Sequence, residues 1–270
     1  MYKYKRAAIL GVDGAGNFFR QTDTPCMDDL FRDGAVTYDA LTSIPTISAE
    51  CWGSMLIGVG PETHGLTNEI VSTKAYDVES KYPSIFRVLR DARPQAEMFS
   101  VCGWNPINTG IIEENVGVTK LAAENDAGVC EKILGCLDGG GDPVLLFAQF
   151  DDVDGAGHKF GYGNKLYLKK ITEIDALIGK IVAKYREKGL LEDTLFIISA
   201  DHGGNRLHGH GGKSDREKLI FIGCAGKSVK KGVIRDMHVR DIAAVTAYAL
   251  GIDAPDTWTA KVPKGIFDET

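Results

Sequence analysis

The sequence lacks a closely spaced cysteine pair, although it contains six cysteines among its 270 residues. No two of them form the CxxC pattern of zinc ribbons and thioredoxin-type redox sites, so neither motif is present. Scattered cysteines of this kind are typical of reduced, mostly buried thiols in a cytoplasmic protein. They are Cys26, Cys51, Cys102, Cys130, Cys136 and Cys224.

Long apolar runs are also missing from the sequence. No stretch approaches the ~20 consecutive apolar residues that a membrane-spanning helix needs. The start, MYKYKR followed by AAILGV, imitates a secretory signal, but its apolar run stops at Asp13. A secretory signal needs an apolar run of roughly 7–15 residues and a small-residue cleavage site. We therefore expect no signal peptide, no membrane partner and a cytoplasmic location.

An excess of basic residues is absent as well. The chain has 31 Lys and Arg against 37 Asp and Glu, which gives a formal net charge of −6. A structured nucleic acid is therefore not an expected partner, because it requires a basic surface. Small nucleotides remain compatible with this charge. The hydrophobic content of 44% is that of an ordinary globular protein with enough apolar material for a core.

Neither an internal repeat nor a low-complexity tract interrupts the chain, and the glycine-rich stretch 137–143 is too short for a domain linker. We therefore predict a single domain over residues 1–270. Apolar segments of strand length alternate with helical patterns. Strands are predicted at Ala7–Val12, Val36–Leu41, Glu97–Cys102, Val144–Phe150, Leu195–Ser199 and Leu219–Ile222.

Helical spacing of apolar residues occurs between these strands. Helices are predicted at residues 49–58, 83–91, 122–136, 165–188 and 240–250. Continuously apolar strands that alternate with helices indicate the α/β class. We expect a mostly parallel central sheet flanked by helices on both faces.

Polar side chains follow three of the predicted strands. Asp13 comes after the first strand, the segment DDVDGAGH after Val144–Phe150, and ADHGG after Leu195–Ser199. Ligands of open parallel sheets bind beyond the carboxyl ends of the strands. Carboxylates and imidazoles together suit zinc or manganese. A single Asp-Gly is usually only a turn, but three strand-end carboxylates, two of them followed by histidines, indicate a metal site.

These motifs resemble the alkaline phosphatase superfamily, and within it the type I phosphodiesterase/nucleotide pyrophosphatase family. The resemblance extends from Asp13 to about residue 254. It rests on PTISAECWGSMLIGVGPETHG, DVDGAGHKFG, SADHGG and HVRDIAAVTAYALGIDAP, in this order. It implies an alkaline-phosphatase-like fold without a large cap domain, and a metal-dependent hydrolase of phosphoric esters built on one catalytic domain.

The resemblance also implies two divalent metal ions, zinc with manganese as the alternative. One ion would bind the side chains of Asp154, His158 and His210, and the other those of Asp13, Asp201 and His202. Three alternatives stay open at this point. His208 can replace His210, and either Asp151 or Asp152 can replace Asp154, although the four-residue spacing to His158 favours Asp154.

The nucleophile implied by the resemblance is Ser48, counted back from PETHG, and its hydroxyl is also a metal ligand. Thr46 is the alternative. Metal coordination activates a serine hydroxyl, and a two-metal clamp stabilises both oxygens of an in-line displacement. Ser48 precedes the helix predicted at 49–58, whose start attracts phosphate; its other possible role is to cap that helix.

Four further positions lie within or next to the motifs that carry the resemblance. Asn68 is implied to bind a phosphoryl oxygen, although it stands one position out of the family's register. Glu50 and Cys51 occupy positions where many members of the family have Pro-Asn. His64 of PETHG is expected to orient the turn rather than to bind metal.

The implied reaction is hydrolysis of a small phosphorylated substrate, such as a nucleotide, by a phosphodiesterase/nucleotide pyrophosphatase through a phosphoserine intermediate. A phosphomonoesterase is the alternative, and a catalytically inactive metal-binding relative is a further one. The choice between diester and monoester depends on cations that sequence cannot place, such as Lys159 and Lys213. Trp52, Trp104 and Tyr162 are candidates either for stacking on a base or for packing. No oligomeric state is predicted.

Overall fold

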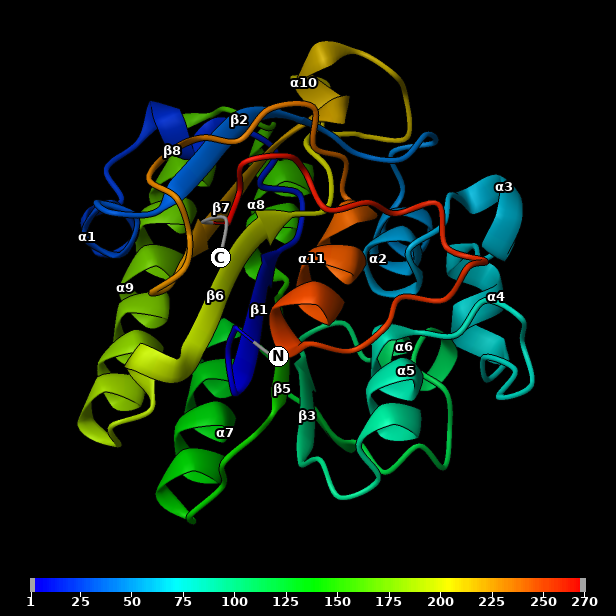
Figure 1. Cartoon of the computed structure of the whole chain (residues 1–270). Helices are drawn as coiled ribbons and strands as arrows, with labels where there is room; N and C mark the ends of the chain where they lie inside the picture. The colour runs from blue at the N-terminus through cyan, green and yellow to red at the C-terminus, as the bar shows by residue number, and fades with distance from the viewer. Residues whose placement is uncertain (1–2, 268–270) are drawn as a thin grey trace.

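The computed structural model describes residues 3–267 of the chain. Its strands form one sheet in the order β4-β3-β5-β1-β6-β7-β2-β8 (Figure 1). The strands are β1 (Arg6–Val12), β2 (Ala35–Leu41), β3 (Met98–Cys102), β4 (Thr119–Ala122), β5 (Leu145–Phe150), β6 (Thr194–Ala200), β7 (Leu219–Ala225) and β8 (Gly232–Val233).

The sheet is mostly parallel, as the sequence predicted. β1 pairs in parallel with β5 on one side and β6 on the other, and β3 pairs in parallel with β4 and β5. β7 is antiparallel to both of its neighbours, β6 and β2. All residues of β5 and β6 are buried, which explains their continuously apolar sequences.

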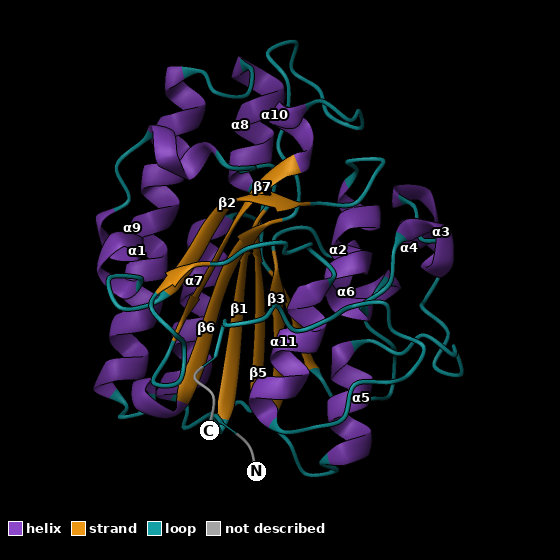
Figure 2. Cartoon of the chain, turned by 45° about the horizontal axis from the view of Figure 1, so that its top comes forward, coloured by secondary structure: helices purple, strands orange, loops and turns teal. Residues whose placement is uncertain are grey.

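Helices cover both faces of the sheet (Figure 2). On one face α9 packs against α1, α7 and α8, and on the other α11 packs against α2 and α5. The α-helices are α1 (Pro25–Leu30), α2 (Ser48–Ile57), α3 (Pro61–His64), α4 (Asn68–Thr73), α5 (Ile85–Ala92), α6 (Pro106–Gly110), α7 (Asp126–Asp138), α8 (Asp152–Phe160), α9 (Lys165–Glu187), α10 (Asp215–Lys218) and α11 (Asp241–Leu250).

Most predicted elements are present, with small shifts at their ends. The prediction of a helix at 122–136 is wrong at its start. Thr119–Ala122 form strand β4, and helix α7 begins only at Asp126, after Asn125, whose side chain caps it. The segment after β5 forms helix α8, which was not predicted as a helix. Its glycines, Gly155 and Gly157, lower helix propensity and hide the pattern.

The fold agrees with the alkaline-phosphatase-like architecture that the resemblance implies, and no large cap domain is present among the described residues. Within the same residues, none of the helices has both the length and the apolar character required to cross a bilayer.

Candidate metal-binding active site

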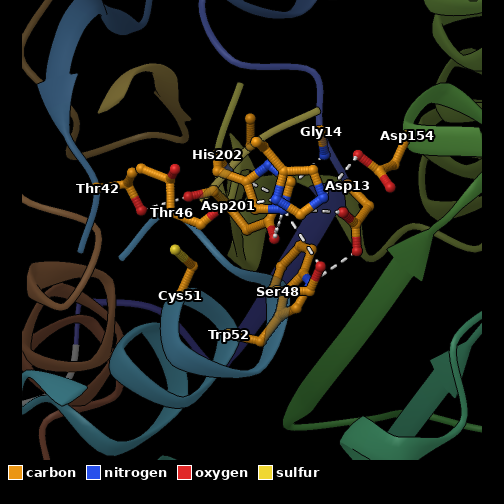
Figure 3. Close-up of polar contacts among 12 residues, drawn as sticks. Asp13, Gly14, Thr42, Thr46, Ser48, Cys51, Trp52, Asp154, Asp201 and His202 are labelled. Atoms are coloured by element: carbon orange, nitrogen blue, oxygen red, sulfur yellow. Dashed lines mark hydrogen bonds and ion pairs between the residues drawn. The ribbon is translucent and has the colours of Figure 1, made fainter. Parts of the chain in front are cut away.

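The predicted metal ligands gather where three neighbouring strands end. β1 lies between β5 and β6, so the residues that follow these strands meet at one edge of the sheet. Asp13 follows β1, and its backbone N–H donates to the carbonyl of Phe150 at 2.8 Å. Asp201 and His202 follow β6, and Figure 3 shows their side chains beside those of Asp13 and Asp154.

One group of ligands, which we call site A, consists of Asp154, His158 and His210. Asp154 and His158 lie one turn apart on α8, so they share a face of the helix. Asp154 Oδ2 is 3.1 Å from His158 Nε2. His210 Nε2 lies 3.2 Å from His158 Nε2 and 3.9 Å from Asp154 Oδ1. Their ligand atoms all lie within 4.8 Å of one another.

The second group, which we call site B, consists of Asp13, Asp201 and His202. His202 Nε2 is 3.5 Å from Asp13 Oδ1 and 3.3 Å from Asp201 Oδ2. Both of these oxygens are buried and have no hydrogen-bond partner. Asp154 also lies within 4.8 Å of Asp13 and His202, and the rings of His202 and His210 stack at 4.0 Å. Sites A and B are therefore adjacent.

The three histidines of sites A and B all direct their Nε2 atoms toward the carboxylates. Nδ1 of His158 donates to the carbonyl of His208 at 2.8 Å, and Nδ1 of His210 donates to the carbonyl of Thr46 at 2.8 Å. Nδ1 of His202 lies 3.0 Å from the carbonyl of Gly203. Because a carbonyl only accepts, Nδ1 carries the proton and the Nε2 lone pair faces the site, as in metal-binding histidines.

The two carboxylates of site B, Asp13 and Asp201, are buried, and the ion pairs they form among the described residues are with His202, whose own burial lowers its pKa. Burial, and the neighbouring carboxylate of Asp201, raise the pKa of Asp13 well above its usual range. Burial likewise raises the pKa of Asp201. Burial alone would raise the pKa of Asp154 too, but the hydrogen bond with His158 and nearby histidines lower it to about 2. Clustered, uncompensated carboxylates are what divalent cations stabilise.

The residues of sites A and B therefore fit two divalent ions. Two buried carboxylate oxygens lack partners, and the Nε2 atoms of His158 and His210 face each other at 3.2 Å. Two such lone pairs repel unless a proton or a cation lies between them. Without metal, the hydrogen bond to Asp154 raises the pKa of His158 to about 9, so its Nε2 carries a proton that a bound cation would replace.

Ser48 lies beside site B. It is the first residue of α2, is 9% exposed, and its Oγ is 3.2 Å from His202 Nε2 (Figure 3). Ser48 is the first helical residue rather than the N-cap, which is Ile47, and its hydroxyl contacts His202. The hydroxyl of Thr46 donates to the carbonyl of Gly212 at 3.0 Å and accepts from Gly211 N at 2.9 Å, so it is fully engaged.

Asn68 reaches the same helix start despite its shifted register. Its Oδ1 accepts a hydrogen bond of 2.9 Å from the backbone N–H of Ala49, the residue after Ser48. His64 lies away from the ligands: its Nε2 contacts the carbonyl of Glu50 at 3.2 Å, and its Nδ1 accepts from Leu66 N at 3.0 Å. These contacts agree with the role predicted for His64 in the turn.

The alternative ligands have other contacts. Asp151 accepts from Gln149 Nε2 at 2.8 Å, and the ring of His208 lies against the carbonyl of His158 at 3.0 Å. Asp152 lies near Lys170, at 3.8 Å. The ligand-atom clusters of the described residues are Asp154–His158–His210 and Asp13–Asp154–His202, and they include none of these three. Asp201 is also outside them and joins site B through its contact of 3.3 Å with His202 Nε2.

Two aromatic side chains form hydrogen bonds with the candidate ligands that the sequence did not predict. Trp52 and Tyr162, considered for base stacking, are 0% and 1% exposed. Trp52 Nε1 donates to Asp13 and the hydroxyl of Tyr162 donates to Asp154. They are therefore unable to stack on a substrate. Only the fold brings donor and carboxylate together, so no spacing in the sequence could reveal these bonds.

Comparison with known sequences agrees with this geometry. Residues 104–222 match the family described as type I phosphodiesterase / nucleotide pyrophosphatase. That segment contains all of site A and both His202 and Asp201 of site B. It does not include the segment of Ser48.

Several curated proteins are similar to parts of the chain. The catalytic subunit of GPI ethanolamine phosphate transferase 3 of Mus musculus is 36% identical over 34% of this chain and 8% of its own length. GPI ethanolamine phosphate transferase 2 of Aspergillus fumigatus is 25% identical over 72% of this chain and 26% of its own length. The bis(5'-adenosyl)-triphosphatase enpp4 of Mus musculus is 24% identical over 73% of this chain and 47% of its own length. The chain thus spans less than half of each of these relatives.

Solved structures share the fold at low sequence identity. A murine ectonucleotide pyrophosphatase / phosphodiesterase 5, in an inactive form complexed with AMP, has a TM-score of 0.75 and 12% identity, and covers 92% of this chain and 96% of its own. A 2-O GAG sulfatase has a TM-score of 0.77 and 12% identity, over 96% of this chain and 73% of its own. The resemblance inferred from the motifs is confirmed: the chain has the fold of the alkaline phosphatase superfamily and matches, within it, the type I phosphodiesterase / nucleotide pyrophosphatase family.

Proposed function

We propose that the chain is a metal-dependent hydrolase of phosphodiesters, with a nucleotide-like ester as its substrate class and Ser48 as its nucleophile. The observation that carries this proposal is the Ser48 hydroxyl, 3.2 Å from His202 Nε2 and beside a cluster of unpartnered carboxylate oxygens. A hydroxyl next to two adjacent metal sites is the arrangement that in-line displacement at phosphorus requires.

The ions would be held by the chain's own side chains, by Asp154, His158 and His210 in site A, and by Asp13, Asp201, His202 and Ser48 in site B. When bound, they would supply Lewis-acid activation of the hydroxyl and neutralise charge on the entering and leaving oxygens. Zn²⁺ suits this mixture of carboxylate and imidazole ligands, with Mn²⁺ as the alternative.

The residues around Ser48 suit a phosphoryl group. Its Oγ would form the new bond to phosphorus, and the bond from phosphorus to the leaving alcohol or nucleotide would break on the opposite side. The start of α2 would present the positive end of its dipole to the phosphoryl oxygens. Asn68, bonded to Ala49 N, lies at the same helix start and would donate from its amide nitrogen.

Completion of the reaction requires removal of the phosphoryl group from Ser48. Water would form a new bond to phosphorus and the bond to Ser48 Oγ would break, with its oxygen regaining a proton. Two successive in-line displacements give net retention of configuration at phosphorus. The hydroxyl proton of Ser48 would leave to solvent when Oγ bonds to phosphorus, and the attacking water would return one, because Nε2 of His202, which faces Ser48 at 3.2 Å, would serve as a ligand of site B.

A diester substrate is favoured by the ion pairs of the candidate ligands, none of which involves Lys or Arg in the described part of the chain. Among residues 3–267, the ion pairs of Asp13, Asp154 and Asp201 involve only histidines. The ammonium of Lys159 lies over the ring of Phe160, 5.2 Å from its centroid. A monoester carries additional negative charge that needs a positive partner, so a phosphomonoesterase is the second reading.

The names of similar proteins support a nucleotide. The murine ectonucleotide pyrophosphatase / phosphodiesterase 5 structure contains AMP, and enpp4 is named as a bis(5'-adenosyl)-triphosphatase. The GPI ethanolamine phosphate transferases favour a second candidate function, in which an alcohol rather than water accepts the phosphoryl group from Ser48. The chemistry up to phosphorylated Ser48 is the same for both.

The test is a metal-controlled assay with two chromogenic esters. Protein freed of metal with a chelator should be inactive, and Zn²⁺ or Mn²⁺ should restore hydrolysis of bis-p-nitrophenyl phosphate. We expect its kcat/KM to exceed that for p-nitrophenyl phosphate by at least about tenfold. Adding ethanolamine at increasing concentration and measuring ester products separates transfer from hydrolysis.

Each outcome has a defined meaning. A preference for p-nitrophenyl phosphate would establish the monoesterase reading instead. Two bound ions without turnover of either ester or of ATP would indicate a metal-binding relative that has lost catalysis. Full activity in excess chelator would contradict the proposal.

A further inference from the structure

Two buried aromatic side chains donate hydrogen bonds to the carboxylates of sites A and B. Trp52 Nε1 donates to Asp13 Oδ2 at 2.9 Å, and the hydroxyl of Tyr162 donates to Asp154 Oδ1 at 2.5 Å. Figure 3 shows the indole of Trp52 on α2 directed at Asp13. Each site therefore has one carboxylate that is held by one aromatic donor.

The bond from Trp52 determines which oxygen of Asp13 faces site B. Oδ2 also accepts from Gln149 Nε2 at 3.0 Å, so this oxygen has two donors. Oδ1 has no partner and lies 3.5 Å from His202 Nε2. The two donors therefore leave one oxygen directed at the ion position and fix the rotation of the carboxylate.

The bond from Tyr162 has the same relation to site A. Asp154 Oδ1 accepts from the hydroxyl, while Oδ2 faces His158 Nε2 at 3.1 Å. The ring of Tyr162 also packs edge-on against His158 and His210, with centroids 5.8 and 6.2 Å apart. One side chain thus contacts all three members of site A.

Close contacts with glycine backbone hold both rings in place. A Cβ at Gly11 would lie 2.4 Å from the ring of Trp52, and a Cβ at Gly157 or Gly204 would lie 2.4 Å from the ring of Tyr162. No other residue type fits at these positions without moving a ring. The packing therefore favours a defined location for each donor atom.

We propose that Trp52 and Tyr162 are positioning residues, each serving one ion: Trp52 orients Asp13 for site B, and Tyr162 orients Asp154 for site A. This inference rests on the proposed function, because it requires that the two sites bind ions. Groups that hydrogen-bond to a metal ligand fix its orientation and tune its basicity, and their loss costs about 10–100-fold in metal affinity. Purely structural rings would affect unfolding alone.

The experiment measures ion affinity with isosteric variants that remove one donor. Metal-free wild type, Trp52→Phe and Tyr162→Phe are titrated with Zn²⁺ in competition with a chromophoric chelator. Trp52→Phe should weaken one of two binding events by about 10–100-fold and leave the other within about threefold. Tyr162→Phe should weaken the other event. Asp201→Asn and His158→Ala identify which event belongs to site B and which to site A.

Two matched controls come from the same chain. Trp258 is buried and its Nε1 donates to the carbonyl of Pro83 at 3.0 Å, away from the ligands. Tyr185 is fully buried and its hydroxyl has no partner. Trp258→Phe and Tyr185→Phe should leave both affinities unchanged. If Trp52→Phe does not fold, Gln149→Leu removes the second donor to Asp13 and should weaken the same event.

The outcomes separate this inference from the proposed function. Two ions bound by the wild type, with unchanged or equally weakened affinities in Trp52→Phe and Tyr162→Phe, would overturn the inference and leave the hydrolase proposal standing. Fewer than two ions bound by the wild type would overturn both. Site-selective weakening in the two variants supports the assignment.

Discussion

The hydroxyl oxygen of Ser48 lies 3.2 Å from Nε2 of His202, although 154 positions of sequence separate the two residues. The fold creates this contact because α2 starts at the edge of the sheet where β6 ends. Since His202 donates from Nδ1 to the carbonyl of Gly203, its Nε2 accepts a hydrogen bond from the Ser48 hydroxyl. The oxygen of Ser48 therefore faces site B.

Replacement of Ser48 by alanine should abolish turnover while both ions stay bound, because site B keeps the side chains of Asp13, Asp201 and His202. We expect kcat to fall by at least about 10³-fold, because the attacking oxygen is lost, while metal analysis still finds two ions. Thr46→Ala is the matched control. Its hydroxyl binds Gly211 and Gly212, so its loss should cost about 1 kcal/mol of stability and change kcat less than tenfold. The opposite ranking of the two variants would make Thr46 the nucleophile.

Asn68 should contribute to transition-state binding rather than to metal binding. Asn68→Ala removes the donor beside Ser48, so kcat/KM should fall by about 10²–10³-fold with unchanged ion affinity. Asn68→Asp keeps an acceptor for Ala49 N but replaces the amide donor by a negative charge, and should be at least as impaired. Steady-state kinetics on bis-p-nitrophenyl phosphate measure both. Wild-type kcat/KM in Asn68→Asp would exclude the predicted role.

The metal-free protein should gain stability when one site carboxylate is neutralised. Burial raises the pKa of Asp201 well above its usual range, so its contribution to stability is present at low pH and lost as pH rises through the folded-state pKa. At pH 8 and without metal, the free energy of unfolding of Asp201→Asn should be about 1–3 kcal/mol higher than that of the wild type. In excess Zn²⁺ the order should reverse. Denaturant unfolding with and without chelator tests this, and a less stable metal-free variant would refute it.

Protonation of His64 should lower the free energy of unfolding in mild acid. Burial lowers the pKa of His64 to about 4, below the usual 6.5. The stability it contributes is present above about pH 6.5 and lost as pH falls through 4, on the order of 3 kcal/mol. His64→Asn keeps an acceptor for Leu66 N and should reduce the slope of the stability profile of the metal-free protein between pH 4 and 6.5. Burial lowers the pKa of His238 to about 4 as well, so part of the slope should persist. An unchanged slope in this variant would contradict the assignment.

Much of the fold was predictable because its strands are buried on both faces. Continuous apolar runs such as Val144–Phe150 correspond to strands in which every residue is buried. β4 and β8 are short and mostly exposed, so they carry no such pattern. Helix α8 contains Gly155 and Gly157, which obscured it, although the Asp154–His158 spacing is that of one helical turn.

The candidate site was predictable as a set of ligands but not as a network. The resemblance implied candidate ligands by motif, and the structure brings these side chains together in sites A and B. Trp52 and Tyr162 were considered as substrate contacts, yet both are buried against carboxylates. Trp52 lies 39 residues from Asp13, and Tyr162 lies 8 residues from Asp154. Only the packing of α2 and of the loop after α8 brings the indole N–H and the tyrosine hydroxyl to these carboxylates.

The most direct measurement is anomalous diffraction from crystals grown with Zn²⁺ and vanadate, which mimics a phosphoryl group bound to a nucleophile. We predict two anomalous peaks, one about 2.0–2.2 Å from ligand atoms of Asp154, His158 and His210 and one at the same distance from Asp13, Asp201 and His202, with vanadium bonded to Ser48 Oγ. A single peak, peaks outside these residues, or vanadate bound away from Ser48 would contradict the account.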